Sequence, residues 1–231
     1  MEVKQRKKRS DTGTRLTERD LLALRLIGEQ YALRFDQLQH LLGHHAKAHT
    51  KHAGMLSESA TRHALDRWQH AGLVQHKKIL ADLPAFCWLT REGLYAASLP
   101  FHPLEPSPTQ LHHIGWVAQA RLHFASLHPE WSWTSERWLR TQLDQKVKSL
   151  KLPDALLHLP DDRRIAIEVE LTHKNATTLE QIIKDRALVY DHTWYFATTR
   201  AQKALHTAID QLDDHYQQRV TIYPLDILTR K

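Results

Sequence analysis

The sequence predicts a mixed α and β protein, with a mostly helical N-terminal part and a C-terminal part in which strands and helices alternate. The first hundred residues contain apolar stripes at helical spacing, followed by a hairpin pattern. Residues 109–231 alternate between the two patterns, which predicts an α/β domain with a central mixed sheet. Four prolines within residues 100–108 predict a linker between the two parts. Apolar residues make up 42% of the 231 residues, which is sufficient for a hydrophobic core in each part.

Positive charge is concentrated in the first hundred residues. They carry 16 Lys and Arg against 10 acids, whereas residues 101–231 carry 16 of each, for a net charge of +6. A localised basic excess is typical of a protein with a polyanion partner, most often nucleic acid. We expect residues 1–14 to form a basic disordered arm, which either contacts DNA or has no partner. Its bases are Lys4, Arg6, Lys7, Lys8 and Arg9.

Several classes of protein are disfavoured by the composition. No apolar run approaches the roughly 18 residues that predict a membrane span, and no apolar signal region follows the basic N-terminus. We therefore expect a cytoplasmic protein with no membrane partner. The single cysteine, Cys87, excludes an internal disulfide and a cysteine-built zinc site. Its position in an apolar strand predicts a buried hydrophobic residue.

Residues 15–99 predict three helices, a hairpin and a further short helix. Thr17 is a suitable N-cap for the first helix, because acids follow it in the first turn. Ser57 opens the third helix, and Gly72 follows its end. The expected elements are helices at 17–31, 35–43, 57–72 and 90–99, with hairpin strands at 73–80 and 85–89.

This order, with Ala71-Gly72-Leu73-Val74 leading into the hairpin and Trp88-Leu89-Thr90 leading out of it, resembles winged helix-turn-helix DNA-binding domains. The resemblance implies that the third helix enters the major groove with its N-terminal residues at base edges. It also implies that lysines of the hairpin contact phosphates. Some winged helices bind only protein, so an adaptor role is an alternative. The implied DNA-binding residues are Ser57, Ser59, Thr61, Arg62, His63, Arg67, Lys77 and Lys78.

The C-terminal part begins with an apolar helix and continues with alternating elements. The segment at 135–140, after Trp133, fits either a strand or a helix, and we favour a strand that gives way to a loop. We expect residues 142–150 to form a loop over the site. The other expected elements are helices at 109–127, 177–190 and 200–216, and strands at 152–159, 163–171, 192–198 and 219–223.

Carboxylates interrupt the second strand of the hairpin at 152–171, whose turn is Pro160-Asp161-Asp162. Because side chains alternate along a strand, Ile165, Ile167, Val169 and Leu171 share one face, and Ala166, Glu168 and Glu170 share the other. Two neighbouring carboxylates repel each other unless a cation or hydrogen bonds hold them. The simplest alternative to a functional site is an exposed face on which these acids pair with Arg163, Arg164 or Lys174.

Pro153-Asp154 and Glu168-Val169-Glu170 resemble the motif of the restriction-endonuclease-like fold, in which Pro-Asp is followed by an acid, one residue and lysine. The resemblance implies that Asp154, Glu168 and the carbonyl of Val169 are metal ligands. Mg²⁺ or Mn²⁺ is the implied cofactor, because hard cations take carboxylate oxygens and polarise a phosphodiester. Glu170 occupies the usual lysine position. The candidate catalytic residues are Asp154, Glu168, Glu170 and Lys174, and Glu136, Gln181 and Lys184 are further polar candidates.

From Leu16 onwards, the winged-helix order followed by Pro-Asp-Ala and Ile-Glu-Val-Glu-Leu-Thr resembles the replication-relaxation family of plasmid and mobile-element proteins. This implies double-stranded DNA binding in replication, mobilisation or their control, alongside other replication or mobilisation proteins. Two hypotheses stay open. The C-terminal domain either nicks DNA as a Mg²⁺-dependent endonuclease, or mediates dimerisation or partner binding in a non-catalytic transcription or replication regulator. The helix at 109–127 is apolar enough for a homodimer, which the sequence does not demand.

Overall fold

The computed structural model describes residues 15–44, 54–142 and 151–229. Over these ranges the protein is an α+β fold with two sheets, about half of it helical, which confirms the broad class that the sequence predicts. None of the helices in these ranges is long and apolar enough to cross a membrane. The basic arm with Lys4, Arg6, Lys7, Lys8 and Arg9 lies outside the described residues, as does nearly all of the loop expected at 142–150.

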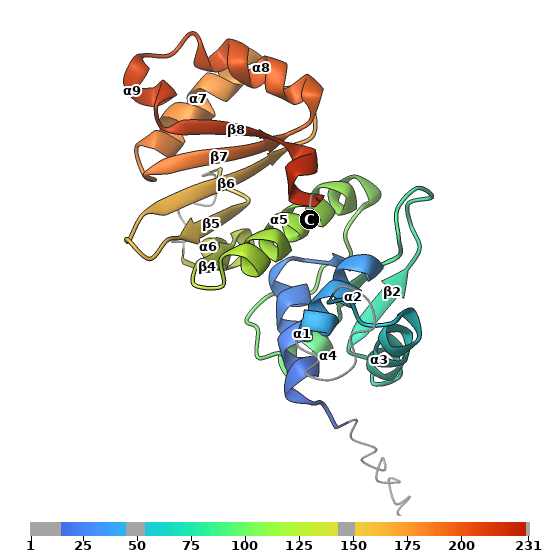
Figure 1. The fold of residues 1–231 in the computed structure, drawn as a ribbon. Coiled ribbons are helices and arrows are strands. Elements are labelled where there is room, and N and C mark those ends of the chain that lie inside the picture. Colours follow the sequence, from blue (N-terminus) through green and yellow to red (C-terminus); the bar gives the residue numbers. More distant parts are fainter. Residues whose placement is uncertain (1–14, 45–53, 143–150, 230–231) are drawn as a thin grey trace, which may run out of the picture.

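The N-terminal half packs helices around a small antiparallel sheet of strand order β1-β3-β2, as Figure 1 shows in part. The predicted helices and hairpin are present, and the short strand β1 was not foreseen. A strand of two residues is too short to show an alternating pattern in the sequence. The elements are α1 Glu18–Glu29, β1 Leu33–Arg34, α2 Phe35–His44, α3 Glu58–His70, β2 Val74–Lys77, β3 Phe86–Leu89 and α4 Arg91–Ala96.

Capping residues begin the helices where the sequence predicts. The Thr17 hydroxyl accepts a hydrogen bond from the Asp20 amide at 3.2 Å, and the Asp20 carboxylate accepts one from the Thr17 amide at 2.9 Å. This reciprocal pair satisfies two amides at the start of α1. The Ser57 hydroxyl caps α3 in the same position. After α3 the chain turns at Gly72, whose φ of 72° is a conformation that glycine adopts without strain.

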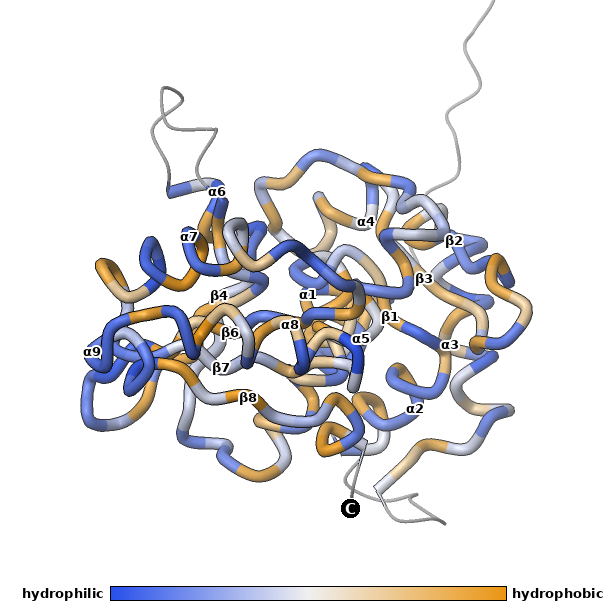
Figure 2. Tube along the Cα trace, turned by 90° about the horizontal axis from the view of Figure 1, so that it is seen from above, coloured by the Kyte–Doolittle hydropathy of each residue, from blue (hydrophilic) through white to orange (hydrophobic). Residues whose placement is uncertain are grey.

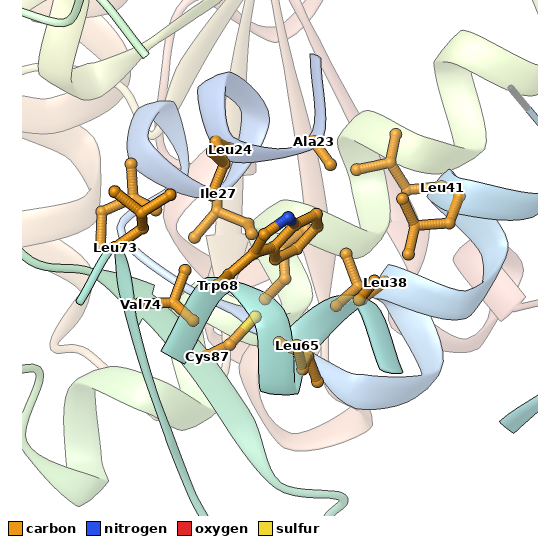
Figure 3. Close-up of a cluster of buried hydrophobic side chains, with 14 of the residues drawn as sticks. Ala23, Leu24, Ile27, Leu38, Leu41, Leu65, Trp68, Leu73, Val74 and Cys87 are labelled. Atoms are coloured by element: carbon orange, nitrogen blue, oxygen red, sulfur yellow. The ribbon is translucent and has the colours of Figure 1, made fainter. Parts of the chain in front are cut away.

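Trp68 lies at the centre of the N-terminal core (Figure 3). It is fully buried, together with Leu24 from α1, Leu38 from α2 and Cys87 from β3. The prediction that Cys87 is a buried hydrophobic residue is confirmed. Burial raises the pKa of its thiol to about 12, so the reactive thiolate form is suppressed.

The C-terminal half is a five-stranded sheet of order β4-β5-β6-β7-β8. Strands β4, β5 and β6 pair antiparallel, whereas β6, β7 and β8 pair parallel, so the sheet is mixed. Helices α7, α8 and α9 lie on one side of it, and α5 lies on the other (Figure 1). The strands are β4 Ser132–Ser135, β5 Ala155–His158, β6 Arg164–Glu170, β7 His192–Ala197 and β8 Val220–Pro224. The other elements are α5 Pro108–Leu127, α6 Glu136–Gln142, α7 Ala176–Ala187, α8 Thr199–Ile209, α9 Asp214–Gln217 and the 3-10 helix Leu225–Thr229.

Two expected elements of this half are corrected. At 135–140 the favoured strand giving way to a loop is wrong and the alternative, a helix, is present, because α6 begins directly after β4. A helix of seven residues spans too few turns to show clear periodicity. The helix predicted at 200–216 is divided into α8 and α9, and Leu212 between them is buried in the core beneath. The short helix α9 is mainly hydrophilic and lies at the outer rim (Figure 2).

Helix α5 joins the two halves. Its Ala118 and Leu122 belong to the N-terminal core, whereas Val117 and Phe124 belong to the core beneath the five-stranded sheet. In Figure 1 it runs between the two sets of elements. The proline-rich segment at 100–108 is also packed at its start, where the Phe101 ring lies 4.9 Å from the nearer ring centre of Trp138. The apolar character of α5 is therefore explained by burial against both cores of its own chain.

Candidate functional site

The hairpin of β5 and β6 brings the Pro-Asp segment beside the second acidic segment. Pairing of Ala155 with Ile167 places Asp154, just before β5, close to the carboxyl end of β6. The Asp154 carboxylate accepts a hydrogen bond from the Val169 amide at 2.8 Å. The Asp154 carbonyl accepts one from the Glu136 amide at 3.2 Å, which fixes the start of α6 at the same place.

His113 from α5 completes this corner of the site, and the sequence analysis missed it. Its Nε2 lies 3.1 Å from Asp154 Oδ2 and 3.2 Å from the Val169 carbonyl oxygen. Both neighbours are acceptors, so Nε2 bears a hydrogen in this arrangement. Burial by itself lowers the pKa of His113, but the hydrogen bond and negative charge of Asp154 outweigh it, and the pKa is raised.

Glu168 forms a buried ion pair with Arg186 of α7. Arg186 Nε donates to Glu168 Oε1 at 2.7 Å, and the two side chains are only 6% and 15% exposed. Arg186 also donates to the carbonyl of Lys151. The pKa of Glu168 is raised to about 7, because burial and the negative charge of Asp154 together outweigh the opposing effect of Arg186. A guanidinium group therefore holds the carboxylate that the motif assigns to a metal.

Glu170 is also paired, although it lies at the usual lysine position. The Lys174 ammonium group donates to its carboxylate, which is nearly buried. Lys174 therefore places a positive charge at the end of β6, beside the acids with which the sequence suggests it could pair. Asp154, Glu168 and Glu170 therefore each have a different hydrogen-bonding partner, His113, Arg186 and Lys174 respectively, and the two cations among these partners offset part of the repulsion between the carboxylates.

The weaker candidates lie in different surroundings. Glu136 accepts hydrogen bonds from Arg140 and, at 3.2 Å, from the Tyr31 hydroxyl. Gln181 donates to Asp185 at 2.7 Å on the exposed side of α7. Lys184, on the same helix, is partly buried. Of these candidates, only Glu136 borders the same pocket as Asp154.

Among the described residues, no group of three or more His, Cys, Asp or Glu side chains is arranged to hold a metal ion. The donors that meet at one point are two side-chain atoms and one carbonyl: His113 Nε2, Asp154 Oδ2 and the Val169 oxygen. Mg²⁺ sites commonly use one or two carboxylates and keep several waters. The Asp154 carboxylate and the Val169 carbonyl are oxygens of the kind that a hydrated divalent cation takes, and the His113 nitrogen can join them only when it is neutral and its Nε2 carries no proton. Glu168 faces Arg186 instead.

A pocket of about 470 Å³ opens beside Asp154 and His113. Residues at the end of α1, the start of α5 and the start of α6 form its walls, so it lies between the two halves of the protein. It includes Ser135, the last residue of β4, whose hydroxyl is buried and has no hydrogen-bond partner among the described residues.

The candidate DNA-binding residues of α3 divide into exposed and buried positions. Ser59, Arg62, His63 and Arg67 are exposed, and so is Ser57 at the N-cap. Thr61 must be removed from the predicted set, because it is fully buried and its hydroxyl donates to the Ser57 carbonyl at 3.0 Å. It belongs to the face of α3 that packs on the core, one helical turn before Ala64 and Leu65.

The exposed arginines of α3 already have acidic partners. Arg62 pairs with Glu58 at 2.5 Å, and its guanidinium lies 5.2 Å from the centre of the Phe35 ring. Arg67 pairs with the buried carboxylate of Asp20 at 2.9 Å. The Arg62 pair is exposed on both sides and so contributes little to stability, which leaves its guanidinium available to a stronger anion.

Lys77 and Lys78 lie at the exposed end of β2, and α3 packs beside this strand. Lys77 pairs with Glu105 at 2.7 Å, and Lys78 donates to the carbonyl of Leu83.

No protein-family model matches the sequence, and no curated protein is significantly similar to it. A function must therefore be inferred from two features, the α3–β2 surface and the corner around Asp154.

Proposed function

We propose that the protein binds double-stranded DNA through residues 15–99, which we interpret as a winged helix-turn-helix domain. The observation that carries this proposal is the exposed face of α3, with Ser59, Arg62 and His63. It lies beside β2, which ends at Lys77 and is followed by Lys78. The N-terminal residues of such a helix reach base edges, while hairpin lysines contact phosphates. The excess of bases in the first hundred residues supports a polyanion partner.

We further propose that residues 109–231 are a restriction-endonuclease-like domain, and that the whole chain is a protein of the replication-relaxation type. The mixed sheet, the helices on both sides of it and the contact of Asp154 with Val169 support this assignment. In this proposal the protein acts on plasmid or mobile-element DNA, in replication, mobilisation or their control, together with other proteins of those processes.

Replacing both wing lysines, Lys77→Ala with Lys78→Ala, is expected to weaken duplex binding and to reduce its salt dependence. Each lost phosphate contact lowers the slope of log affinity against log salt by about one. Arg62→Ala is expected to weaken binding by about 1–3 kcal/mol on the preferred sequence if it contacts a base. Fluorescence anisotropy with labelled duplexes at several salt concentrations measures both effects.

The matched control for these variants is Arg163→Ala, which removes one exposed base from the distant β5–β6 turn, where it pairs with Asp161. It should leave duplex affinity unchanged. Equal binding by the wild type, the lysine variant and the Arg62 variant would contradict the proposed surface. Absence of any duplex binding at low salt would favour an adaptor that contacts only protein.

A second candidate function, metal-dependent nicking of DNA, is favoured by the convergence of His113 Nε2, Asp154 Oδ2 and the Val169 carbonyl. These atoms would hold Mg²⁺ or Mn²⁺, which when bound polarises a phosphodiester and activates water. Lys174, which is half exposed beside Glu170, supplies a positive charge for a developing phosphate anion. Arg186 offsets the negative charge of Glu168, so this carboxylate needs no metal ion to do so.

Asp154→Ala and His113→Ala are each expected to reduce nicking of supercoiled plasmid in Mn²⁺ or Mg²⁺ by about 100-fold or more, since each removes a proposed ligand. Even loss of groups that only orient ligands has effects of about 10- to 100-fold. Gel electrophoresis of nicked and supercoiled forms measures the rate. Asp161→Ala, which removes an exposed acid from the hairpin turn, is the control and should nick normally.

If the wild type leaves plasmid intact with either metal, nicking is excluded, and the non-catalytic regulator is the better hypothesis. In that case Asp154→Ala should bind duplex DNA as the wild type does. The C-terminal half would then mediate dimerisation or partner binding, which analytical ultracentrifugation of the whole chain would examine.

A further inference from the structure

We propose that the pocket beside Asp154 binds a single unpaired nucleobase of a DNA strand. This inference rests on the proposed DNA-binding function and specifies which part of the DNA the pocket between the two halves recognises. At about 470 Å³, the pocket has the size typical of small-molecule sites, which bury most of their ligand. It is continuous with the corner formed by Asp154 and His113, so a base held there would bring its sugar-phosphate backbone to that corner.

The walls of the pocket have the chemistry of a nucleobase site. Leu104, Ile114 and Val117 provide apolar surface, and Tyr31 provides an aromatic side chain. Gln110 at the rim provides an amide. A base has flat apolar faces and a polar edge, so it matches apolar and aromatic walls that carry a few hydrogen-bonding groups.

The Ser135 hydroxyl is the observation that points most directly to a ligand. Ser135 is only 2% exposed, and its Oγ has no hydrogen-bond partner among the described residues. A buried hydroxyl without a partner is unfavourable, and such groups in native proteins usually meet water or a ligand. Ser135 pairs with Ala155 across β4 and β5, so it sits one strand position from Asp154. The edge of a bound base would give this hydroxyl its missing partner.

The charges in the pocket favour a base over a phosphate group. Glu29, Glu136 and Asp154 line it, and each carboxylate already has a partner: Arg121 for Glu29, Arg140 for Glu136 and His113 for Asp154. These pairs leave no unpaired cation in the described lining to bind a phosphate, whereas a carboxylate oxygen can accept a further hydrogen bond. Carboxylates instead accept hydrogen bonds from the exocyclic amino groups of adenine, cytosine and guanine. We therefore expect these bases to bind better than thymine, which has no such group.

Nucleosides without phosphate provide the direct test. Deoxycytidine, deoxyadenosine and thymidine are titrated into the full chain, with binding followed by saturation-transfer NMR and calorimetry. Deoxycytidine or deoxyadenosine should bind in the millimolar range or tighter, and thymidine more weakly. Ser135→Ala should weaken binding about threefold to tenfold, the range for one hydrogen bond. Thr109→Trp, a bulky change at the exposed rim, should abolish binding.

Ser135→Ala should fold normally, because it removes a hydroxyl that has no partner among the described residues. Its melting temperature should be unchanged or slightly higher than that of the wild type. Ser132→Ala, on the exposed end of the same strand, is the matched control and should bind nucleosides normally. If no nucleoside binds the wild type, the proposal is overturned. Equal binding by the wild type, Ser135→Ala and Thr109→Trp overturns it as well.

Duplex binding measured on the same preparations separates this proposal from the proposed function. A protein that binds duplex DNA and loses that binding in the Lys77→Ala, Lys78→Ala variant, yet binds no nucleoside, contradicts only the base pocket. A protein that binds nucleosides through Ser135 but no duplex contradicts only the winged-helix proposal.

Discussion

Replacing Arg186 with alanine is expected to lower the free energy of unfolding by about 3–5 kcal/mol, which is the range for breaking a buried ion pair from one side. Arg186 is 6% exposed, and its partner Glu168 is 15% exposed. Without the guanidinium, the Glu168 carboxylate stays buried with no cation of the described residues at hydrogen-bond distance, and the Lys151 carbonyl loses its donor. Urea unfolding followed by tryptophan fluorescence measures the change.

The exposed pair of Arg163 and Asp161 is the matched control, with 60% and 54% of the side chains exposed. Arg163→Ala should change stability by less than about 1 kcal/mol. Combining Arg186→Met with Glu168→Gln should recover most of the loss, because no buried charge is left unpaired. If Arg186→Ala is as mild as Arg163→Ala, water reaches the Glu168 carboxylate in solution.

This pair also separates stability from activity within the motif. Because Glu168 faces Arg186 while Asp154 faces His113, the two motif acids have different expected roles. Glu168→Gln should affect unfolding more than the proposed nicking activity, whereas Asp154→Ala should affect that proposed activity more than unfolding. A sequence motif cannot make this distinction, since it assigns both acids to one metal.

The position of the carboxylate hairpin could be predicted because its signals are local. Alternation along Ile165, Ile167 and Val169 marks the strand, and Pro160 marks the turn. The cationic partners could be predicted only in part. Lys174 was expected near the acids and pairs with Glu170, but Arg163 pairs with Asp161 instead.

His113 and Arg186 could not be found from the sequence. They lie 41 and 18 residues from their acidic partners, on helices whose rotation against the sheet depends on packing. His113 is one of 18 histidines in the chain, so residue type gave no distinction. A histidine within the apolar stripe of a helix next to a motif strand is a signal worth testing in similar sequences.

The same limit applies to the division into two halves. The prolines at 100–108 follow α4 and precede most of α5, but they do not show that α5 is shared. That follows from packing, because Ala118 and Leu122 face one core while Val117 and Phe124 face the other. A helix that is apolar on two sides has no strong periodic signal, and burial within one chain and dimerisation look the same in sequence.

Arg137→Ala is the second substitution expected to have a large effect, because this residue ties α6 to the N-terminal half. Its Nη1 and Nη2 donate to the carbonyls of Gly28 and His102, both at 2.6 Å. Its guanidinium also lies 4.6 Å and 4.4 Å from the ring centres of Tyr31 and Phe101. Loss of two charge-assisted hydrogen bonds and both ring contacts should lower the free energy of unfolding by about 3–5 kcal/mol.

Arg140→Ala is the control on the same helix, because Arg140 is half exposed and pairs with Glu136 one turn away. It should alter stability by less than about 1 kcal/mol. Arg137→Lys should restore only part of the loss, since an ammonium group lacks the planar fork that reaches two carbonyls at once. Because Arg137 and α5 both connect the halves, the wild type should unfold in one transition, and Arg137→Ala should separate it into two. A single transition in Arg137→Ala would mean that the remaining contacts between the halves, those of α5 among them, are sufficient to couple the two cores.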